Sequence, residues 1–210
     1  MPTTPRTLDF IFDFGSPNAY LCHKVLPDFA ARTGLTVNYV PCLLGGIFKA
    51  TGNKPPFMAF APVKMQYELL ELKRFVRRHK IPYRMNPHFP VNTLALMRGA
   101  MVARDEGFLL PYVDGILRYM WETPRKLDDP AVFAQTLTEL GFDAEHILRR
   151  SADEDIKQAL ADSTAAAVER GVFGIPTFFL GDEMWFGKER LRDIEEFLAE
   201  AQPAGESTHG

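Results

Sequence analysis

The chain has little cysteine, and the cysteines do not form a pattern that supports redox chemistry. Its 210 residues include only Cys22 and Cys42, which are too few for a disulfide framework and do not form a Cys-x-x-Cys pair. We expect both thiols to be buried as small hydrophobic side chains. The five histidines show no ligand spacing such as His-Glu-x-x-His, so we predict no metal site.

Long hydrophobic runs and an excess of basic residues are also missing. No stretch approaches the roughly 18 apolar residues of a membrane span, and residues 1–6 begin no signal-peptide-like run. We therefore expect a cytoplasmic protein with no membrane partner. The formal net charge of −3 gives no overall basic field for nucleic acid. The basic stretch 73–80 keeps its apolar residues on one helix face, which favours a solvated helix flank over a nucleic-acid patch.

What the chain does have is the composition of an ordinary globular protein, with 46% hydrophobic and 24% charged residues. Its first part alternates apolar and polar residues at 8–14 and 35–40, with helical spacing at 18–32 between them. This pattern predicts a strand, a helix and a second strand. Such a βαβ unit has a right-handed crossover.

The middle of the chain is helical in pattern. A Pro-rich connector at 81–91 separates two helical stretches, and Asn92 and Asp129 are candidate N-cap residues. The predicted helices span 62–79, 94–106, 112–122, 131–140, a short segment after Asp143, and 153–170.

The last part returns to β structure and completes a fold prediction. Residues 177–180 and 183–186 flank Gly-Asp as in a two-residue hairpin, and 188–201 has the spacing of an amphipathic helix. We predict an α/β, thioredoxin-like fold with an inserted all-helical domain, among several α/β layouts that the pattern allows. The thioredoxin-like domain would combine 1–43 with 162–201, the insertion would span 44–161, and 202–210 would be a frayed tail.

The first candidate for chemistry is Ser16, between the first predicted strand and the first predicted helix. The free N–H groups and the positive dipole end of a helix N-terminus favour an anion there. Ser16 either only caps this helix or also donates to a thiolate and keeps it deprotonated. The Gly-x-Ser-x-Gly elbow of serine hydrolases is absent because Phe14 and Asn18 occupy its glycine positions, which argues against an acylated serine.

Two further junctions are candidates. Pro176 directly precedes a predicted strand, and a cis Ile175–Pro176 bond would turn the N–H and C=O of Ile175 toward an extended ligand. A trans proline at a strand start is the alternative with the better base rate. Residues 186–190 form another strand-to-helix junction with charges of both signs, which is also typical of a solvated first helical turn.

Four motifs carry a resemblance to a known family. They are Phe-Asp-Phe-Gly-Ser-Pro at 12–17, Gly-Asn-Lys-Pro-Pro at 52–56, Val-Phe-Gly-Ile-Pro-Thr at 172–177 and Phe-Leu-Gly-Asp-Glu-Met-Trp-Phe-Gly at 179–187. In this order and spacing, they resemble the 2-hydroxychromene-2-carboxylate isomerases and the related kappa-class glutathione transferases. The last motif is closer to the isomerase form, and the match covers residues 8–198.

The resemblance implies a DsbA-like architecture, a homodimer, a small aromatic substrate and bound glutathione whose sulfur faces Ser16, the catalytic thiolate stabiliser. Asn53 would hydrogen-bond the tripeptide, Lys64 would meet its glycyl carboxylate and Ile175 would pair with its cysteinyl backbone. The residues implied to bind glutathione are Ser16, Pro17, Asn18, Asn53, Lys64, Ile175, Lys188 and Glu189. Ser-Pro-Asn-Ala stands where dithiol relatives have Cys-x-x-Cys, so dithiol chemistry is not available there.

One departure from the family concerns the γ-glutamyl site, where Lys188-Glu189 stands in place of Asn-Asp or Ser-Asp. Glu189 keeps the negative charge but extends it by a methylene, and Lys188 introduces a cation for the α-carboxylate. We expect glutathione to bind with altered geometry.

The resemblance implies a glutathione-dependent cis–trans isomerase that interconverts 2-hydroxychromene-2-carboxylate and trans-o-hydroxybenzylidenepyruvate in aromatic catabolism. The thiolate adds, the ring opens and rotates, and the thiolate leaves without redox change. Trp121, Tyr83 and Asn92 are candidate substrate-side residues. Two alternatives stay open: a kappa-like transferase that conjugates electrophiles, and a non-catalytic binding module on the same fold.

Overall fold

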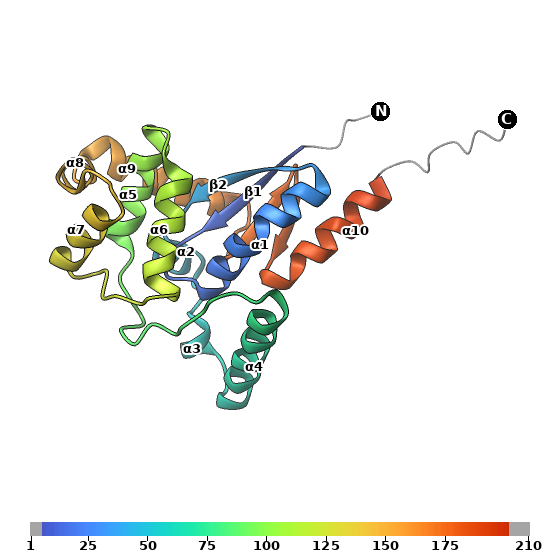
Figure 1. The fold of residues 1–210 in the computed structure, drawn as a ribbon. Helices are drawn as coiled ribbons and strands as arrows, with labels where there is room; N and C mark the ends of the chain where they lie inside the picture. The colour runs from blue at the N-terminus through green and yellow to red at the C-terminus, as the bar shows by residue number, and fades with distance from the viewer. Residues whose placement is uncertain (1–5, 202–210) are drawn as a thin grey trace.

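The computed structural model describes residues 6–201. The chain builds one four-stranded sheet and surrounds it with helices (Figure 1). The strands are β1 (Thr7–Phe12), β2 (Thr36–Pro41), β3 (Thr177–Leu180) and β4 (Glu183–Phe186). The helices are α1 (Pro17–Thr33), α2 (Leu44–Thr51), α3 (Pro56–Ala59), α4 (Pro62–His79), α5 (Leu94–Asp105), α6 (Leu109–Trp121), α7 (Pro130–Glu139), α8 (Ala144–Arg150), α9 (Glu154–Glu169) and α10 (Leu191–Ala201).

The strand order is β2-β1-β3-β4, so the two strands from the first part of the chain lie beside the two strands from its last part. β1 pairs in parallel with β2, with Phe10 opposite Tyr39, and antiparallel with β3, with Phe10 opposite Phe178. β4 completes the antiparallel hairpin with β3. The βαβ unit, the hairpin and the thioredoxin-like fold that the sequence predicts are therefore confirmed.

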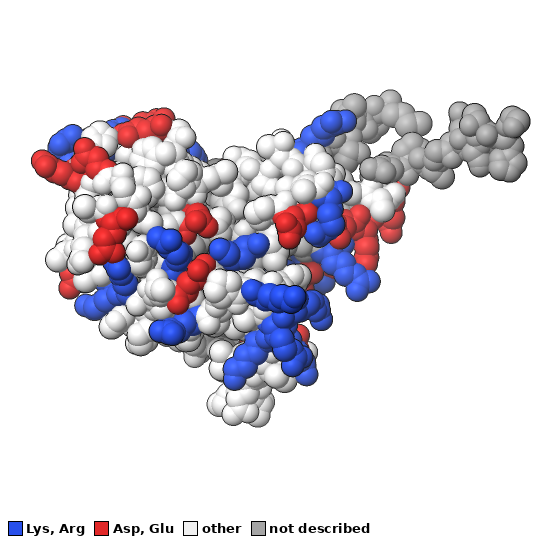
Figure 2. Space-filling view, viewed as in Figure 1, with Lys and Arg blue, Asp and Glu red and all other residues white. Residues whose placement is uncertain are grey.

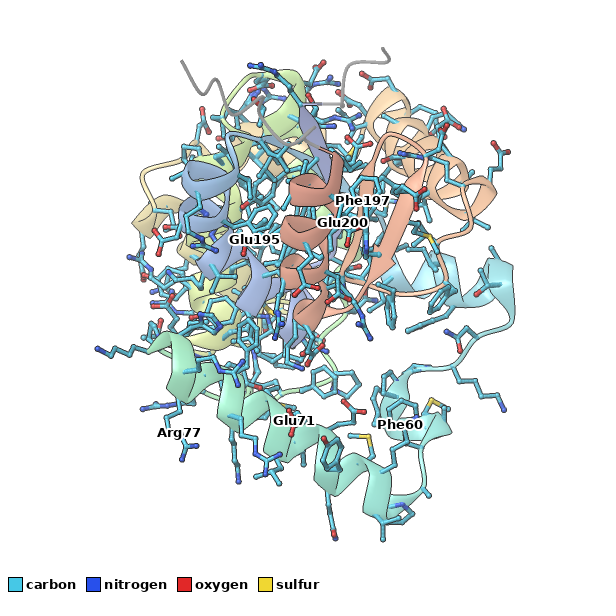
Figure 3. The ribbon with its side chains drawn as sticks, turned by 90° about the vertical axis from the view of Figure 1, so that its right-hand side faces the viewer. Phe60, Glu71, Arg77, Glu195, Phe197 and Glu200 are labelled. Carbon is cyan, nitrogen blue, oxygen red and sulfur yellow. The ribbon has the colours of Figure 1, made fainter. Side chains whose placement is uncertain are left out.

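Helices cover both faces of the sheet. Figure 3 shows α1 and α10 on one side of the strands and α9 on the other, with Phe197 of α10 turned toward β4. Its ring lies 5.4 Å from that of Trp185 on β4. Between the layers, buried rings of Phe10, Phe12 and Phe178 stack at centroid distances of 5.3 to 5.8 Å, which adds to the stabilisation from burial.

The helical part packs closely where α5 and α6 cross. A Cβ atom at Gly99 of α5 would lie 2.1 Å from the hydroxyl oxygen of Tyr112 on α6, so only glycine allows this approach. The Tyr112 hydroxyl, fully buried, donates to the carbonyl of Leu96 at 2.9 Å. This bond satisfies a polar group that burial would otherwise penalise.

The structure also corrects several sequence predictions. β1 ends at Phe12 rather than Phe14, because the Asp13 carboxylate accepts the Gly15 amide and starts a turn. α5 starts at Leu94, and Asn92 accepts the Leu94 amide from outside the helix rather than at the cap position. The short helices α2 and α3 were not predicted as separate elements. Residues 188–190 form a 3₁₀ turn, η1 (Lys188–Arg190), before α10.

Other predictions fare differently. Cys22 and Cys42 are both buried, as expected, and burial raises the pKa of Cys42 to about 11, so that its thiol stays protonated near neutral pH. The division into domains at residue 161 stays a prediction, and α9 runs continuously across that position. The tail at 202–210 lies outside the described residues. None of the helices within 6–201 is long and apolar enough to cross a membrane.

α4 lies below the sheet in Figure 1 and packs on the rest of the molecule through one side only. Leu72 and Phe75 are its buried side chains, while Lys73, Arg74 and Arg77 are exposed. Figure 2 shows lysine and arginine side chains gathered on α4, next to an uncharged tip. The basic side chains at 73–80 are thus exposed while Phe75 is buried, as expected for the flank of a helix, and the absence of a nucleic-acid partner stays a prediction.

Candidate active site at the N-terminus of α1

Ser16 occupies the N-cap position of α1 and makes two hydrogen bonds there. Its Oγ accepts the amide of Ala19 at 3.2 Å, and its hydroxyl donates to the carbonyl of Ile175 at 3.1 Å. The residue is only 4% exposed. The capping role that the sequence allowed is thus present, but the same hydroxyl also joins α1 to a loop almost at the other end of the chain. Its role toward a thiolate stays a prediction.

The facing loop carries a cis peptide bond between Ile175 and Pro176, so the trans alternative is wrong. The Thr177 hydroxyl donates to the Gly174 carbonyl at 2.7 Å, and the Gly187 amide donates to the Pro176 carbonyl at 3.0 Å. These bonds fix the loop from both sides. Within residues 6–201, the Ile175 amide donates no hydrogen bond, which leaves it available to a ligand.

Pro17 and Asn18 complete the first turn of α1. Pro17 occupies the first helical position, where its missing N–H is not needed. The side-chain Oδ1 of Asn18 is shielded from solvent and has no hydrogen-bond partner among the described residues. Buried polar atoms normally have a partner, so an unpaired amide beside Ser16 indicates a place for a polar ligand group.

The carboxyl group of Asp13, to which the sequence gives no role, is buried next to this corner and holds its backbone through hydrogen bonds. Asp13 is fully buried and accepts the amides of Gly15 at 2.8 Å and Leu44 at 2.7 Å. Burial raises the pKa of Asp13, and the hydrogen bonds from Gly15 and Leu44 partly offset this. The signal in the sequence was an acidic residue placed directly between an apolar strand and Gly-Ser-Pro. Asp13 thereby joins the turn that follows β1 to the start of α2.

Trp121 has a supporting role different from the predicted one. Its side chain is 0% exposed, and its indole N–H donates to the Phe14 carbonyl at 2.9 Å. Tyr83 stacks on it with ring centroids 6.1 Å apart. The expectation that Trp121 faces a substrate is therefore wrong for this structure, because the ring has no open face. Tyr83 is partly exposed and Asn92 is exposed, so both stay candidates.

Asn53 joins the same corner from the end of α2. The helix ends at Gly52 in a left-handed conformation with φ of 70°, which turns the chain back toward the loop before β3. The side-chain amide of Asn53 then donates to the Phe173 carbonyl at 2.9 Å. Asn53 therefore contacts this loop two residues before Ile175, and its own side chain remains exposed.

Lys188 and Glu189 lie next to the loop, but they pair with each other. Lys188 is 3% exposed, and its Nζ forms an ion pair with the Glu189 carboxylate. The ring of Phe75 on α4 lies 6.0 Å from the same Nζ and covers it. Nothing in the sequence around Lys188 indicates this burial. A ligand α-carboxylate can reach the Lys188 cation only if the pair with Glu189 rearranges.

Lys64 is the predicted residue that the structure does not bring to this corner. It lies exposed in the first turn of α4, where its Nζ sits 3.8 Å from the ring centroid of Phe60. Figure 3 shows Phe60 beside α3, well below the sheet. The other predicted residues lie on segments that are hydrogen-bonded to the loop before β3. Ser16 bonds to Ile175, Asn53 to Phe173, and Gly187, just before Lys188, to Pro176. Their role in binding glutathione stays a prediction.

The fold and this corner define a class of protein, and comparison with known proteins agrees. A model of the DSBA-like thioredoxin domain matches residues 7–199. The chain therefore belongs to the DsbA-like thioredoxin family.

Individual known proteins are similar over nearly the whole chain. A 2-hydroxychromene-2-carboxylate isomerase of Pseudomonas putida is 33% identical over 91% of this chain and 93% of its own length. A solved structure of such an isomerase superposes with a TM-score of 0.80 at 30% identity, covering 92% of this chain and 95% of the other. Glutathione S-transferase kappa 1 of Caenorhabditis elegans is 27% identical over 100% of this chain and 98% of its own. The resemblance found in the motifs is thus confirmed.

Proposed function

We propose that this protein is a glutathione-dependent isomerase that interconverts 2-hydroxychromene-2-carboxylate and trans-o-hydroxybenzylidenepyruvate, with a role in aromatic catabolism. Relatives that carry the isomerase name over more than nine-tenths of both chains support the reaction. The observation that carries the proposal is the buried Ser16 hydroxyl at the N-terminus of α1, facing the loop at Ile175.

The corner has the polar groups that a bound tripeptide needs. The Ile175 amide and the Asn18 carboxamide have no partner within the described chain, and the Asn53 amide is close by. An extended peptide could pair with Ile175 as an added strand does, because its backbone offers a complementary donor and acceptor. These free groups support glutathione as the cofactor.

Ser16 would change partners when the cofactor binds. A hydroxyl has one proton to donate, and here that proton goes to Ile175. Turning the hydroxyl toward a sulfur anion would release the Ile175 carbonyl for the ligand backbone while the Ala19 amide keeps its bond to Oγ. Ser16 thereby exchanges one acceptor for another without losing the helix cap.

Glutathione, when bound, supplies a nucleophilic thiolate that adds reversibly to the conjugated substrate and is regenerated. The positive end of the α1 dipole and the Ser16 donor favour the charged sulfur. Glu189 would accept the ammonium of the γ-glutamyl group, and Lys188, once released, would meet its carboxylate. Tyr83 and Asn92 would contact the substrate.

The proposal is tested by turnover of Ser16→Ala at saturating glutathione, with Ser163→Ala as a matched control. Ser163 is another serine whose hydroxyl donates to a carbonyl, that of Pro41 at 2.8 Å, and it makes no hydrogen bond to Ser16 or Ile175. Loss of one stabilising bond raises the thiol pKa by about one unit or more, so kcat/KM should fall at least about tenfold. Unchanged turnover of Ser16→Ala would show that the serine has no role toward the thiolate.

A conjugating activity is the second candidate, and the full-length match to a kappa-class transferase favours it. Mass spectrometry of the products separates the two reactions, because isomerisation conserves the mass of the substrate. A product heavier than the substrate by the mass of one glutathione would show that the protein is a transferase and not an isomerase. Failure of the wild-type protein to bind glutathione at millimolar concentration would favour a non-catalytic binding module.

We also propose that the protein is a cytoplasmic homodimer that uses α3 and α4 as its interface. Large apolar side chains are exposed there, including Met58 at 67%, Val63 at 74% and Tyr67 at 55%. A large exposed apolar surface usually marks a site of interaction with another protein. Tyr67→Glu should shift the protein from dimer to monomer in light scattering, whereas Lys73→Glu, on the charged flank of α4, should not. Cell fractionation tests the location.

A further inference from the structure

A cavity lies between α2, α5 and α9, and Ser16 is not among the residues that line it. Its volume is about 350 Å³, within the range of small-molecule sites. None of the predicted catalytic or glutathione-binding residues lines it. The walls come from the segment 43–50 at α2, from the first turn of α5 and from one face of α9. They are formed by Leu43, Gly46, Ala50, Leu94, Arg98, Lys157, Leu160, Ala161, Thr164, Ala165 and Val168.

Most of this wall is apolar, and its one hydroxyl is already used. Thr164 accepts the Leu43 amide at 3.0 Å and donates to the Leu160 carbonyl at 2.7 Å. Lys157 has an exposed partner, Glu154, at 3.4 Å. The remaining polar group of the wall is the guanidinium of Arg98.

Arg98 has no partner in the described part of the chain. Its Nε is shielded from solvent and makes no hydrogen bond, and the side chain takes part in no ion pair within residues 6–201. It also lines a neighbouring cavity of about 310 Å³ together with Asn92 and Asp128. The rest of the Arg98 side chain is partly exposed, so its guanidinium can meet a ligand that enters the cavity, and the natural complement of a guanidinium is an anion.

We propose that this cavity binds a small carboxylate with an apolar body, and that Arg98 holds the carboxylate. The guanidinium fork matches the two oxygens of a carboxylate, and Leu43, Leu94 and Leu160 form the wall for the apolar part. Lys157 adds a second positive charge near the wall. A neutral apolar compound would leave Arg98 unpaired, and an inorganic anion would leave the apolar wall uncovered.

The proposal does not rest on the isomerase reaction, although its ligand class includes carboxylates like those of that reaction. The experiment therefore uses calorimetry without glutathione, with 2-naphthoate as the probe and 2-naphthamide as its neutral analogue. Wild type should bind the acid at least about tenfold more tightly than the amide, because only the acid pairs with Arg98.

Variants then locate the site. Arg98→Gln should lose at least about tenfold in affinity for 2-naphthoate, and Ala50→Leu should block both probes by filling the cavity. Ser16→Ala should bind as wild type does. Arg118→Gln, an arginine on α6 that lines neither cavity, is the matched control and should also bind normally.

Two results would overturn the proposal. Unchanged affinity of Arg98→Gln for 2-naphthoate would show that Arg98 does not hold the carboxylate. Loss of binding in Ser16→Ala, with Arg98→Gln intact, would place the ligand at the α1 corner instead. Neither result depends on turnover, so the failure of this proposal and the failure of the proposed reaction are distinguishable.

Discussion

The Ser16 corner and the α3–α4 segment are built in opposite ways. At the corner, buried hydrogen bonds join segments distant in the chain: Ser16 to Ile175, Asp13 to Leu44 and Trp121 to Phe14. α4 has no side-chain cap at its N-cap residue Ala61, and its apolar residues Val63, Tyr67, Leu69 and Leu70 face solvent. The corner is therefore held in place before any ligand arrives, whereas α4 depends on a few anchors.

This difference teaches where each region gets its geometry. A buried polar network is specific, because each group that loses its partner carries a desolvation penalty. An amphipathic helix with an open apolar face has little to fix its position beyond the side chains that it buries, here Leu72 and Phe75. Substitutions should thus be costly at the corner and mild along α4.

The largest effect is expected for Asp13→Ala. It removes the acceptor of two buried amides, those of Gly15 and Leu44, and should lower the free energy of unfolding by about 3 kcal/mol. Chemical denaturation measures this. Asp9→Ala is the control, since that carboxylate pairs with Arg170 near the surface and should cost less than about 1 kcal/mol. Equal losses in the two variants would contradict the contrast.

Trp121→Phe comes next. The substitution removes the N–H that reaches the Phe14 carbonyl and leaves a gap in a fully buried site, for about 2 kcal/mol. Trp185→Phe on β4, where the ring is only half-buried, should lower the free energy of unfolding clearly less. Thermal denaturation of both variants measures the difference. A smaller loss at Trp121 than at Trp185 would mean that the corner does not depend on this support.

Ser16→Ala should destabilise the fold by about 1 kcal/mol, the usual cost of a lost N-cap. The Ala19 amide loses its acceptor, and the tie to Ile175 disappears. Hydrogen exchange should accelerate at Ala19 more than at Gly34, which caps the other end of α1 through a bond to Ala30. Uniform acceleration along α1 would argue against a local cap.

The smallest effect is expected on α4, for Glu71→Gln. The hydrogen bond from Arg74 lowers the pKa of Glu71 below 4.5, so the pair stabilises the folded state above that pH. The contribution is lost as pH falls through the lowered pKa. The wild type should therefore exceed the variant slightly in Tm near pH 7 and match it in strong acid or in about 1 M salt. A difference that grows in acid would contradict this sign.

The sequence predicted the parts of the fold that depend on local pattern. Alternation in β1 and around Gly181-Asp182, and the capping position of Asp129, were enough to place strands and helices. α2 was not separated because eight residues with two adjacent glycines carry little helical signal. The family motif led to Ser16 and Ile175, and the structure shows them in contact.

Features that depend on distant packing could not be predicted. The burial of Lys188 requires Phe75 of α4 to lie over it, and nothing around Phe-Gly-Lys-Glu-Arg indicates that contact. The open side of Arg98 depends on three helices meeting around it. Likewise, Trp121 was a candidate substrate-side residue because its sequence neighbours do not reveal that Phe14 and Tyr83 enclose it.

The strand order has a consequence for how the protein is made. β1 is synthesised well before its antiparallel neighbour β3, because most of the described chain lies between them. Contacts between residues so far apart form slowly, because a long loop must close first. During synthesis the edge of β1 that pairs with β3 therefore stays unpaired until β3 emerges, and an unpaired strand edge is a site for aggregation.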